Sequence, residues 1–321
     1  MTAARHVVLG STGGAGNAIA RALHDVGLDV CAVNRSGSAD LPSGVEQVGA
    51  DISDAADAGA ALRGADVVYM AAQPPYHRWP QEFRRMLSGV IDATPDGARL
   101  VMVDNLYGYG PGSSPMSEQS PERATDAKGK VRRAMTRVLL EAHRSGRIQT
   151  TIGRASDYFG PRADNSAITA LAIEPAAAGK TIRWTANQDV AHSVAYLPDI
   201  ARAYVTLGTA EQAVGQVWIL PHAPAVTGRE LMAIVNAALP RPVATGTIST
   251  TVLRLASPFH RMSKEALGIA YQWAEPFVVD DSAFRSTFGP FDDTALDEAV
   301  RRTIEWYRSS AATLVRPARE A

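Results

Sequence analysis

Short apolar runs alternate along the first half of the chain with longer segments in which apolar residues recur every three or four positions. Continuous apolar character is typical of strands in a parallel sheet that is covered on both faces, and the longer segments have one apolar helix face each. The alternation predicts an α/β protein with a doubly wound parallel sheet and right-handed crossovers. The predicted strands are 6–10, 29–34, 46–50, 65–72, 99–105 and 149–156, and the predicted helices are 17–27, 53–64, 81–94 and 128–146.

The alternation breaks down after Gly160-Pro161. The segments 199–208 and 215–221 are typical of a return to the sheet, whereas 227–291 is a mixed stretch that is richer in Pro, Trp and Phe. We therefore expect a second, smaller lobe. The expected domains are 1–160, with 190–221 and 294–308 returning to it, and a C-terminal lobe that occupies most of 161–321.

Composition narrows the class of protein. The 32 Lys and Arg residues nearly balance the 33 Asp and Glu residues, so no charge imbalance favours a nucleic acid or an anionic membrane as partner. Cys31 is the only cysteine, which excludes an internal disulfide, and the seven histidines show no spacing that predicts a metal site. The chain lacks a signal-peptide pattern and any apolar run near the ~20 residues of a membrane span. We expect a soluble, cytoplasmic protein.

Three glycines spaced three apart, Gly10, Gly13 and Gly16, follow the first apolar run and open the first helix. In such a turn the first glycine permits the tight bend, the second lets the backbone approach a pyrophosphate, and the third lets the helix pack close to the strand. The alternative is a glycine-rich turn without a ligand. Because the pattern heads a whole series of strands and helices, it predicts a dinucleotide-binding turn.

The end of the second strand indicates which dinucleotide binds. An acidic residue there would accept a hydrogen bond from the ribose 2′-hydroxyl of NAD, but the sequence has Asn34 and Arg35. A guanidinium suits the geometry of a 2′-phosphate, so NADP is favoured over NAD, unless Arg35 merely points into water. Asp51 is a candidate acceptor for the adenine amino group, while Ser53 or Asp54 suits a helix N-cap.

The ordered series of motifs is specific when it is taken as a whole. The chain resembles the extended short-chain dehydrogenase/reductase superfamily, in its NAD-dependent epimerase/dehydratase branch, and the resemblance implies a Rossmann-type sheet followed by a small substrate lobe. It is carried by GSTGGAG, GADISD, VVYMAAQ, VMVDNLYGYGP, GRASDYFGP, AYLPDIARAY and FRSTFGPFDDTALDEAVRRTIEWY. The implied coenzyme contacts are Gly10, Thr12, Gly13, Gly16, Asn34, Arg35, Asp51, Ile52, Ala71, Ala72 and Lys130.

The chain departs from this resemblance at the catalytic positions. Family members typically use a Ser or Thr shortly before a Tyr-Gly pair, and Val103 stands at that position here. They also use a Tyr four residues ahead of a Lys, for the proton that accompanies hydride transfer. Lys130 aligns as that lysine and leaves Asp126 in place of the tyrosine, whereas a shift to Lys128 leaves Ala124.

Another group must then supply the proton. Tyr107 is the first candidate, because its loop follows a strand at the carboxyl edge of the sheet; the alternative is a ring that packs under the nicotinamide without titrating. Asp104 and Asp126 are weaker candidates. Lys130 or Lys128 would hold the nicotinamide ribose. The basic cluster that contains them, which also includes Arg132 and Arg133, is otherwise typical of a solvated helix face.

Two further departures concern the substrate. His192 stands where nucleotide-sugar members have an arginine that clamps the diphosphate, and Asp157 stands where they have an asparagine. A carboxylate repels an anion, so a nucleotide sugar is disfavoured and a less charged small molecule is favoured. The candidate substrate contacts are Asp157, Tyr158, His192 and His77, the last of which equally suits a surface loop. Some of Tyr76, Trp79, Tyr158, Trp184, Phe259 and Trp273 would pack against the substrate.

These observations predict an NADP(H)-dependent oxidoreductase or epimerase-like enzyme that acts on a small, weakly charged metabolite. The alternative is a catalytically inactive NADP(H)-binding sensor or scaffold, which the missing tyrosine favours and the loop DNLYGYGP disfavours. Paired long helices are compatible with a homodimer.

Overall fold

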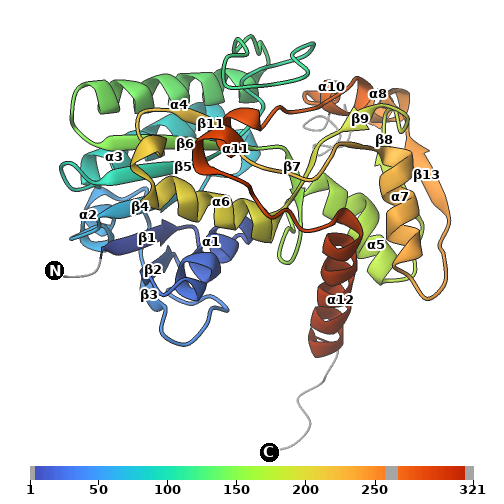
Figure 1. Cartoon of the computed structure of the whole chain (residues 1–321), viewed down its shortest axis with the longest axis horizontal. Helices are drawn as coiled ribbons and strands as arrows, with labels where there is room; N and C mark the ends of the chain where they lie inside the picture. Colours follow the sequence, from blue (N-terminus) through green and yellow to red (C-terminus); the bar gives the residue numbers. More distant parts are fainter. Residues whose placement is uncertain (1–3, 257–266, 315–321) are drawn as a thin grey trace, which may run out of the picture. The chain divides into compact units, whose positions relative to one another are not determined.

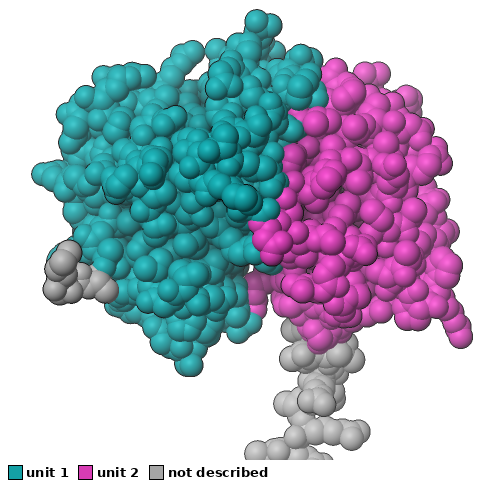
Figure 2. Space-filling view, in the orientation of Figure 1, with its two compact units in different colours: residues 1–156, 198–221, 279–291 teal, residues 157–197, 222–278, 292–321 magenta. Residues whose placement is uncertain are grey.

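The computed structural model of the chain describes residues 4–256 and 267–314 (Figure 1). Phe259, one of the aromatic candidates, lies outside the described residues. The chain divides into two compact units, which Figure 2 shows in different colours. Unit 1 comprises residues 1–156, 198–221 and 279–291, and unit 2 comprises residues 157–197, 222–278 and 292–321.

Unit 1 is built on a seven-stranded parallel sheet. Its strands are β1 (Arg5–Leu9), β2 (Asp29–Asn34), β3 (Glu46–Gly49), β4 (Val67–Met70), β5 (Arg99–Asn105), β6 (Gln149–Ala155) and β11 (Val217–Ile219). They lie in the order β11-β6-β5-β4-β1-β2-β3, and neighbouring strands run parallel. The strand order reverses between β1 and β4, where doubly wound sheets bind ligands. The predicted Rossmann-type α/β fold is therefore confirmed.

Helices cover both faces of this sheet. They are α1 (Gly14–Asp25), α2 (Ala55–Ala61), η1 (Tyr76–Arg78), η2 (Trp79–Phe83), α3 (Arg84–Ala93), α4 (Ala127–Arg144), α6 (Leu197–Thr209), η4 (Glu211–Ala213) and α11 (Ser282–Phe288). Successive residues of β6 reach opposite layers, because side chains alternate along a strand. The Thr150 hydroxyl donates to the Leu139 carbonyl of α4, and the Thr151 hydroxyl donates to the Ala213 carbonyl beyond α6, both at 3.1 Å. In Figure 1, α4 and α6 lie on opposite sides of the sheet.

Arg99, the first residue of β5, joins the sheet to the end of α6. Its guanidinium is buried; Nη1 donates to the carbonyls of Gly208 and Ala210, both at 2.9 Å, and Nη2 pairs with Glu211 at 2.7 Å. The last carbonyls of a helix lack partners within it, and that end carries partial negative charge. A cation in this place therefore satisfies the C-terminus of α6.

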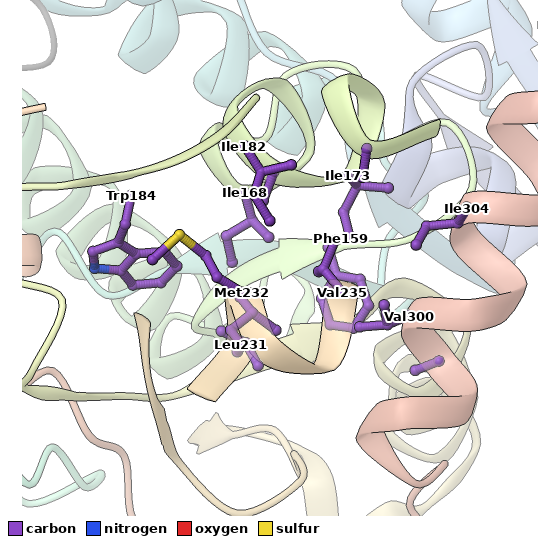
Figure 3. Packing of buried hydrophobic residues seen from close by; sticks show 14 of the residues in the cluster. Phe159, Ile168, Ile173, Ile182, Trp184, Leu231, Met232, Val235, Val300 and Ile304 are labelled. Atoms are coloured by element: carbon purple, nitrogen blue, oxygen red, sulfur yellow. The ribbon is translucent and has the colours of Figure 1, made fainter. Parts of the chain in front are cut away.

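Unit 2 is organised around one apolar cluster. Its elements are β7 (Asp157–Phe159), η3 (Thr169–Ile173), α5 (Glu174–Ala177), β8 (Ile182–Thr185), β9 (Ala191–His192), β10 (Val194–Tyr196), β12 (Val226–Thr227), α7 (Gly228–Ala237), β13 (Thr245–Ile248), α8 (Thr250–Ala256), α10 (Tyr271–Ala274) and α12 (Leu296–Leu314). The strands pair as β10 with β7, β12 with β9, and β13 with β8. Phe159, Trp184, Val235 and Ile304 come from different elements and lie in the apolar cluster (Figure 3).

The structure places α12 in unit 2, whereas the sequence led us to expect that 294–308 returns to the first domain. Residues 190–197 differ from the expectation in the same way. Val300 and Ile304 of α12 belong to the apolar cluster of unit 2, and the helix packs against α5 and α7. The spacing of apolar residues shows that a helix buries one face, but not which element that face meets. Within the described residues, every helix is too short or too polar to cross a membrane.

The buried His6 of β1 should link stability to pH. Its Nδ1 lies 3.2 Å from the Tyr69 hydroxyl, and burial lowers the pKa of His6. The unfolded chain, with an ordinary histidine pKa of about 6.5, therefore takes up the proton first as the pH falls. The free energy of unfolding should decrease below about pH 6.5, as measured by urea titrations at several pH values. His6→Phe should flatten this dependence, and a control at the exposed His77, His77→Gln, should leave it. An unchanged slope in His6→Phe would contradict the assignment.

Arg99→Met should destabilise the protein by about 3 kcal/mol, because it leaves buried helix carbonyls without a donor. Glu211→Gln removes only the exposed partner of Arg99, whose side chain is 82% accessible, and should cost less than about 1 kcal/mol. Urea unfolding of both variants measures the two effects. Equal losses would show that the ion pair, and not the capping of α6, is what Arg99 contributes.

Candidate functional site

The turn between β1 and α1 is so tightly packed that two of its glycines have no room for a side chain. Gly10 has a φ of +87°, in the left-handed region, and a Cβ there would lie 2.7 Å from the backbone nitrogen of Ala72. A Cβ on Gly16 would overlap the carbonyl oxygen of Gly10. Gly13 is exposed, and a Cβ there would make an ordinary 3.5 Å contact with the same oxygen. Gly10 and Gly16 therefore pack the turn, while Gly13 leaves its outer side open.

The N-terminus of α1 is suited to an anion. Within the described residues, no side chain caps it and no acidic residue occupies its first turn. By contrast, Asp54 caps α2 and Asp126 caps α4 through their carboxylates. The free N–H groups and the positive end of the helix dipole favour negative charge. The turn, with the exposed Thr12 beside it, therefore fits the pyrophosphate of a dinucleotide.

The end of β2 offers one fixed and one exposed side chain beside this turn. Asn34 is buried; its amide nitrogen donates to the Ser11 hydroxyl at 2.9 Å, and its oxygen accepts from the Ser36 nitrogen at 3.0 Å. These bonds tie the loop after β2 to the glycine turn, so the Asn34 side chain is occupied within the fold. Arg35 follows it and is exposed. The structure thus distinguishes a residue that shapes the site from one that is available to a ligand.

The loops after β3 and β4 complete this edge of the sheet. Asp51 accepts from the backbone nitrogen and the hydroxyl of Ser53, and these hydrogen bonds, with the charge of Arg35 as a smaller cause, lower the pKa of Asp51. Ile52 is buried. Ala71 and Ala72 are half-buried after β4. The strands β4, β1, β2 and β3 are neighbours in this order and run parallel. The predicted coenzyme residues that follow these strands therefore lie at one edge of the sheet.

The two candidate lysines lie on different faces of α4. Lys128 and Lys130 are separated by about 200° around a helix. Lys130 is exposed, whereas the Lys128 ammonium lies 4.7 Å from the centre of the Tyr76 ring, in the segment after β4. The Asp126 carboxylate accepts from the Gly129 nitrogen at 2.9 Å and so begins the helix. Of the two lysines, Lys128 is the one that the structure directs toward the segment after β4.

Tyr107 lies in the loop after β5, beside the aromatic wall of η2. Its side chain is buried, and its ring centre is 6.2 Å from that of Trp79. The Tyr107 backbone nitrogen donates to the Asn105 side chain at 3.1 Å, which shapes the bend. Val103 is half-buried within β5 and has no group that can transfer a proton. This loop therefore places two phenols after β5: Tyr107, beside Trp79, and the fully buried Tyr109, whose ring centre lies 4.9 Å from the Arg154 guanidinium.

Sequence reasoning missed a buried ionic network at the same edge. Asp104 accepts from Arg154 Nε at 2.9 Å and lies 3.1 Å from Arg132 Nη1, and the exposed fraction of all three side chains is 3–4%. Arg154 also bonds Glu122, and its hydrogen bond to the Thr136 hydroxyl is 2.8 Å. Arg132 is therefore not part of a solvated helix face, as expected from the basic cluster. The available signal was the charged Asp104 within an apolar strand run.

In unit 2, the structure brings together two of the predicted substrate residues. His192 Nε2 lies 3.0 Å from Asp157 Oδ2, and Nδ1 lies 3.1 Å from the Gln272 carbonyl. The His192 ring stacks on Trp273 and Phe277, with centres 4.6 and 5.1 Å away. A carbonyl only accepts hydrogen bonds, so Nδ1 donates. The His192 ring is thereby held between the Asp157 carboxylate and the Gln272 carbonyl.

The remaining candidates belong to both units. Tyr158 is half-buried in β7, next to Asp157, and Trp184 meets the His192 ring edge-on at 5.6 Å. His77 is exposed in η1 of unit 1. In the part of the chain that the structure describes, no three His, Cys, Asp or Glu side chains gather into a group that could hold a metal ion.

Comparison with known proteins agrees with this architecture. Among solved structures, a UDP-glucose 4-epimerase from Thermus thermophilus in complex with NAD is 17% identical, with a TM-score of 0.74, over 95% of this chain and 99% of that one. A UDP-glucuronic acid 4-epimerase from Bacillus cereus, in complex with UDP-glucuronic acid and NAD, is 16% identical, with a TM-score of 0.77, over 95% and 99%. A nucleoside-diphosphate-sugar epimerase from Pseudomonas aeruginosa is 20% identical, with a TM-score of 0.75, over 96% and 98%.

These structures share the fold with this chain. A search of curated protein sequences gives no match. The family model of NAD dependent epimerases and dehydratases matches residues 6–220, which include the glycine turn, the strand ends around it and the loop of Tyr107. The chain therefore belongs to the NAD dependent epimerase/dehydratase family, a family of enzymes.

Proposed function

We propose that the protein is an NADP(H)-dependent oxidoreductase or epimerase that acts on a small, weakly charged metabolite. The observation that carries the proposal is the uncapped N-terminus of α1, with the exposed Arg35 at the neighbouring strand end. When bound, the nicotinamide accepts or donates a hydride at C4. Family membership favours an enzyme over the inactive sensor, although the tyrosine of the customary catalytic position is missing.

The preference for NADP rests on Arg35. Asn34, its neighbour, uses its amide to hold Ser11 and Ser36, and an uncharged amide gives NAD no advantage over NADP. Arg35 supplies a planar cation suited to a 2′-phosphate. The solved structures named above with NAD are 17% and 16% identical to this chain and share its fold, so their coenzyme does not decide the coenzyme of this chain.

The proton would be transferred by Tyr107. This phenol lies after β5 in a loop shaped by Asn105, and Val103 and Asp126 leave the customary positions without a suitable acid. Lys128 would hold the ribose, because it lies on the face of α4 that meets the segment after β4. Tyr107 and Lys128 would thus divide the work of proton transfer and ribose binding.

The substrate class follows from unit 2. Asp157 places a carboxylate beside His192, and a carboxylate repels an anionic diphosphate. Asp157 is partly exposed, with 22% of its side chain accessible, and a carboxylate accepts hydrogen bonds from hydroxyl and amino groups. Asp157, with Tyr158 and His192 around it, therefore suits a neutral, hydroxyl- or amine-bearing molecule better than a nucleotide sugar.

Arg35→Ala should weaken NADPH binding by roughly 10- to 100-fold, because it removes a charge-assisted hydrogen bond. NADH has no 2′-phosphate and loses no such hydrogen bond, so its affinity should change less than about twofold. Fluorescence titration with both coenzymes measures the ratio. Arg137→Ala, at an exposed position on α4, is the matched control and should bind both as the wild type does. A wild-type protein that prefers NADH would refute the NADP assignment.

Tyr107→Phe should reduce turnover by about 10²- to 10⁴-fold while coenzyme affinity is kept, because the variant lacks only the transferable proton. The assay combines NADPH with a panel of ketones, aldehydes and enones, and follows nicotinamide absorbance. Asp126→Ser keeps an N-cap for α4 and serves as the control with normal turnover. A Tyr107→Phe variant as active as the wild type would remove Tyr107 from the mechanism.

A further inference from the structure

Arg132 is buried in a way that stability does not explain. It pairs with Asp104 at 3.1 Å, and 4% and 3% of the two side chains are accessible. The Arg132 Nη1–Asp104 Oδ1 contact is an ion pair without hydrogen-bond geometry. Among the described residues, neither of these two atoms nor Arg132 Nε makes a hydrogen bond. Burying incompletely bonded charges is unfavourable, and a well-packed apolar pair is often at least as stable. The pair therefore points to a role in placing other groups.

The contacts of Arg132 join three separate segments of unit 1. Its Nη2 donates to the Gln73 side chain at 3.3 Å, in the loop after β4. Its guanidinium lies over the rings of Trp79 and Phe83 in η2, 4.5 and 4.9 Å from their centres. Asp104 adds the end of β5. A planar guanidinium can stack and donate at the same time, whereas an ammonium cannot.

These segments lead to both halves of the proposed site. Gln73 follows Ala72, whose backbone would clash with a Cβ on Gly10 and so lies directly against the glycine turn. Trp79 lies 6.2 Å from Tyr107, ring centre to ring centre, and its indole nitrogen donates to the Pro74 carbonyl at 3.0 Å. Arg132 is thus connected to the glycine turn through Gln73 and Ala72, and to the proposed proton partner, Tyr107, through Trp79.

Asp104 is itself held from its other side. Arg154 bonds the second Asp104 oxygen and also reaches Glu122 and Thr136. Its own stacking partner is Tyr109, with the guanidinium 4.9 Å from the ring centre. Arg154 therefore anchors Asp104, whereas Arg132 extends from Asp104 toward Gln73 and Trp79.

We propose that Arg132 is a positioning residue for the nicotinamide end of the coenzyme. Anchored by Asp104, it orders the loop 71–79 and holds Trp79 beside Tyr107, whereas the glycine turn is packed within itself by Gly10 and Gly16. The inference rests on the proposed coenzyme function, and it assigns to Arg132 an effect on the nicotinamide half that the pyrophosphate half does not share.

The test compares two ligands that differ by the nicotinamide riboside half. Arg132→Met should weaken NADPH binding by about tenfold, roughly the effect of one lost hydrogen bond at 1.4 kcal/mol per decade. Binding of 2′-phospho-ADP-ribose should stay within about twofold of the wild type. Arg132→Lys, which keeps the charge but not the planar fork, and Gln73→Leu should act in the same direction. Arg99→Met removes an equally buried arginine at the opposite end of β5 and should not change the ratio of the two affinities.

Amide hydrogen exchange of the free protein gives a second readout. Exchange in 71–79 should rise in Arg132→Met and Arg132→Lys, and not in Arg99→Met. Unchanged exchange in both Arg132 variants overturns the inference, as does an equal loss of affinity for both ligands. A wild-type protein that binds neither ligand would refute the proposed function, while the exchange measurement would still decide whether Arg132 orders the loop.

Discussion

The close approach of backbone to backbone at the β1–α1 turn is the constraint on which the coenzyme site depends. Gly16 lies so near the Gly10 carbonyl, and Gly10 so near Ala72, that a side chain at either position would force the strand ends apart. This closeness brings the N-terminus of α1 to the place where the strand order reverses. The two glycines without side chains allow this close packing. Because no side chain caps α1, its first N–H groups are left for an anion.

Charged side chains are buried at both ends of β5, and they do different work. At the amino end, Arg99 donates to the carbonyls of Gly208, in the last turn of α6, and Ala210, just beyond it, both at 2.9 Å. At the carboxyl end, Arg132 and Arg154 share Asp104, with incomplete hydrogen bonding around Arg132. Arg99 satisfies carbonyls at the end of α6. The Arg132–Asp104 pair buries charges with incomplete hydrogen bonding, so it should contribute less to the free energy of unfolding. Such an imbalance is typical of the edge at which doubly wound proteins place their ligands.

The sequence was sufficient for the sheet, because apolar runs and amphipathic segments are local signals that also determine the order of strands and helices. The glycine turn was equally local. Arg132 was not predictable in the same way: its charge is visible, but its burial depends on Trp79 and Phe83, far away in the chain. The same limit applies to α12, whose apolar face is evident while its partner is not. For the lysines, alignment by spacing favoured Lys130, whereas the structure places the Lys128 ammonium over the Tyr76 ring and leaves Lys130 exposed.

Asn34 restricts how coenzyme choice in this protein could evolve or be engineered. Its nitrogen donates to Ser11 and its oxygen accepts from Ser36, so both ends of one amide are committed. A carboxylate of the same shape would accept from the Ser36 nitrogen and, with the direction of the bond reversed, from the Ser11 hydroxyl, because a hydroxyl both donates and accepts. An acidic residue at position 34 would therefore be held by Ser11 and Ser36, as Asn34 is, and would not be left free to bind a ribose hydroxyl. Arg35 is exposed, and no hydrogen bond ties its side chain to another of the described residues, so coenzyme choice could change there through a single substitution.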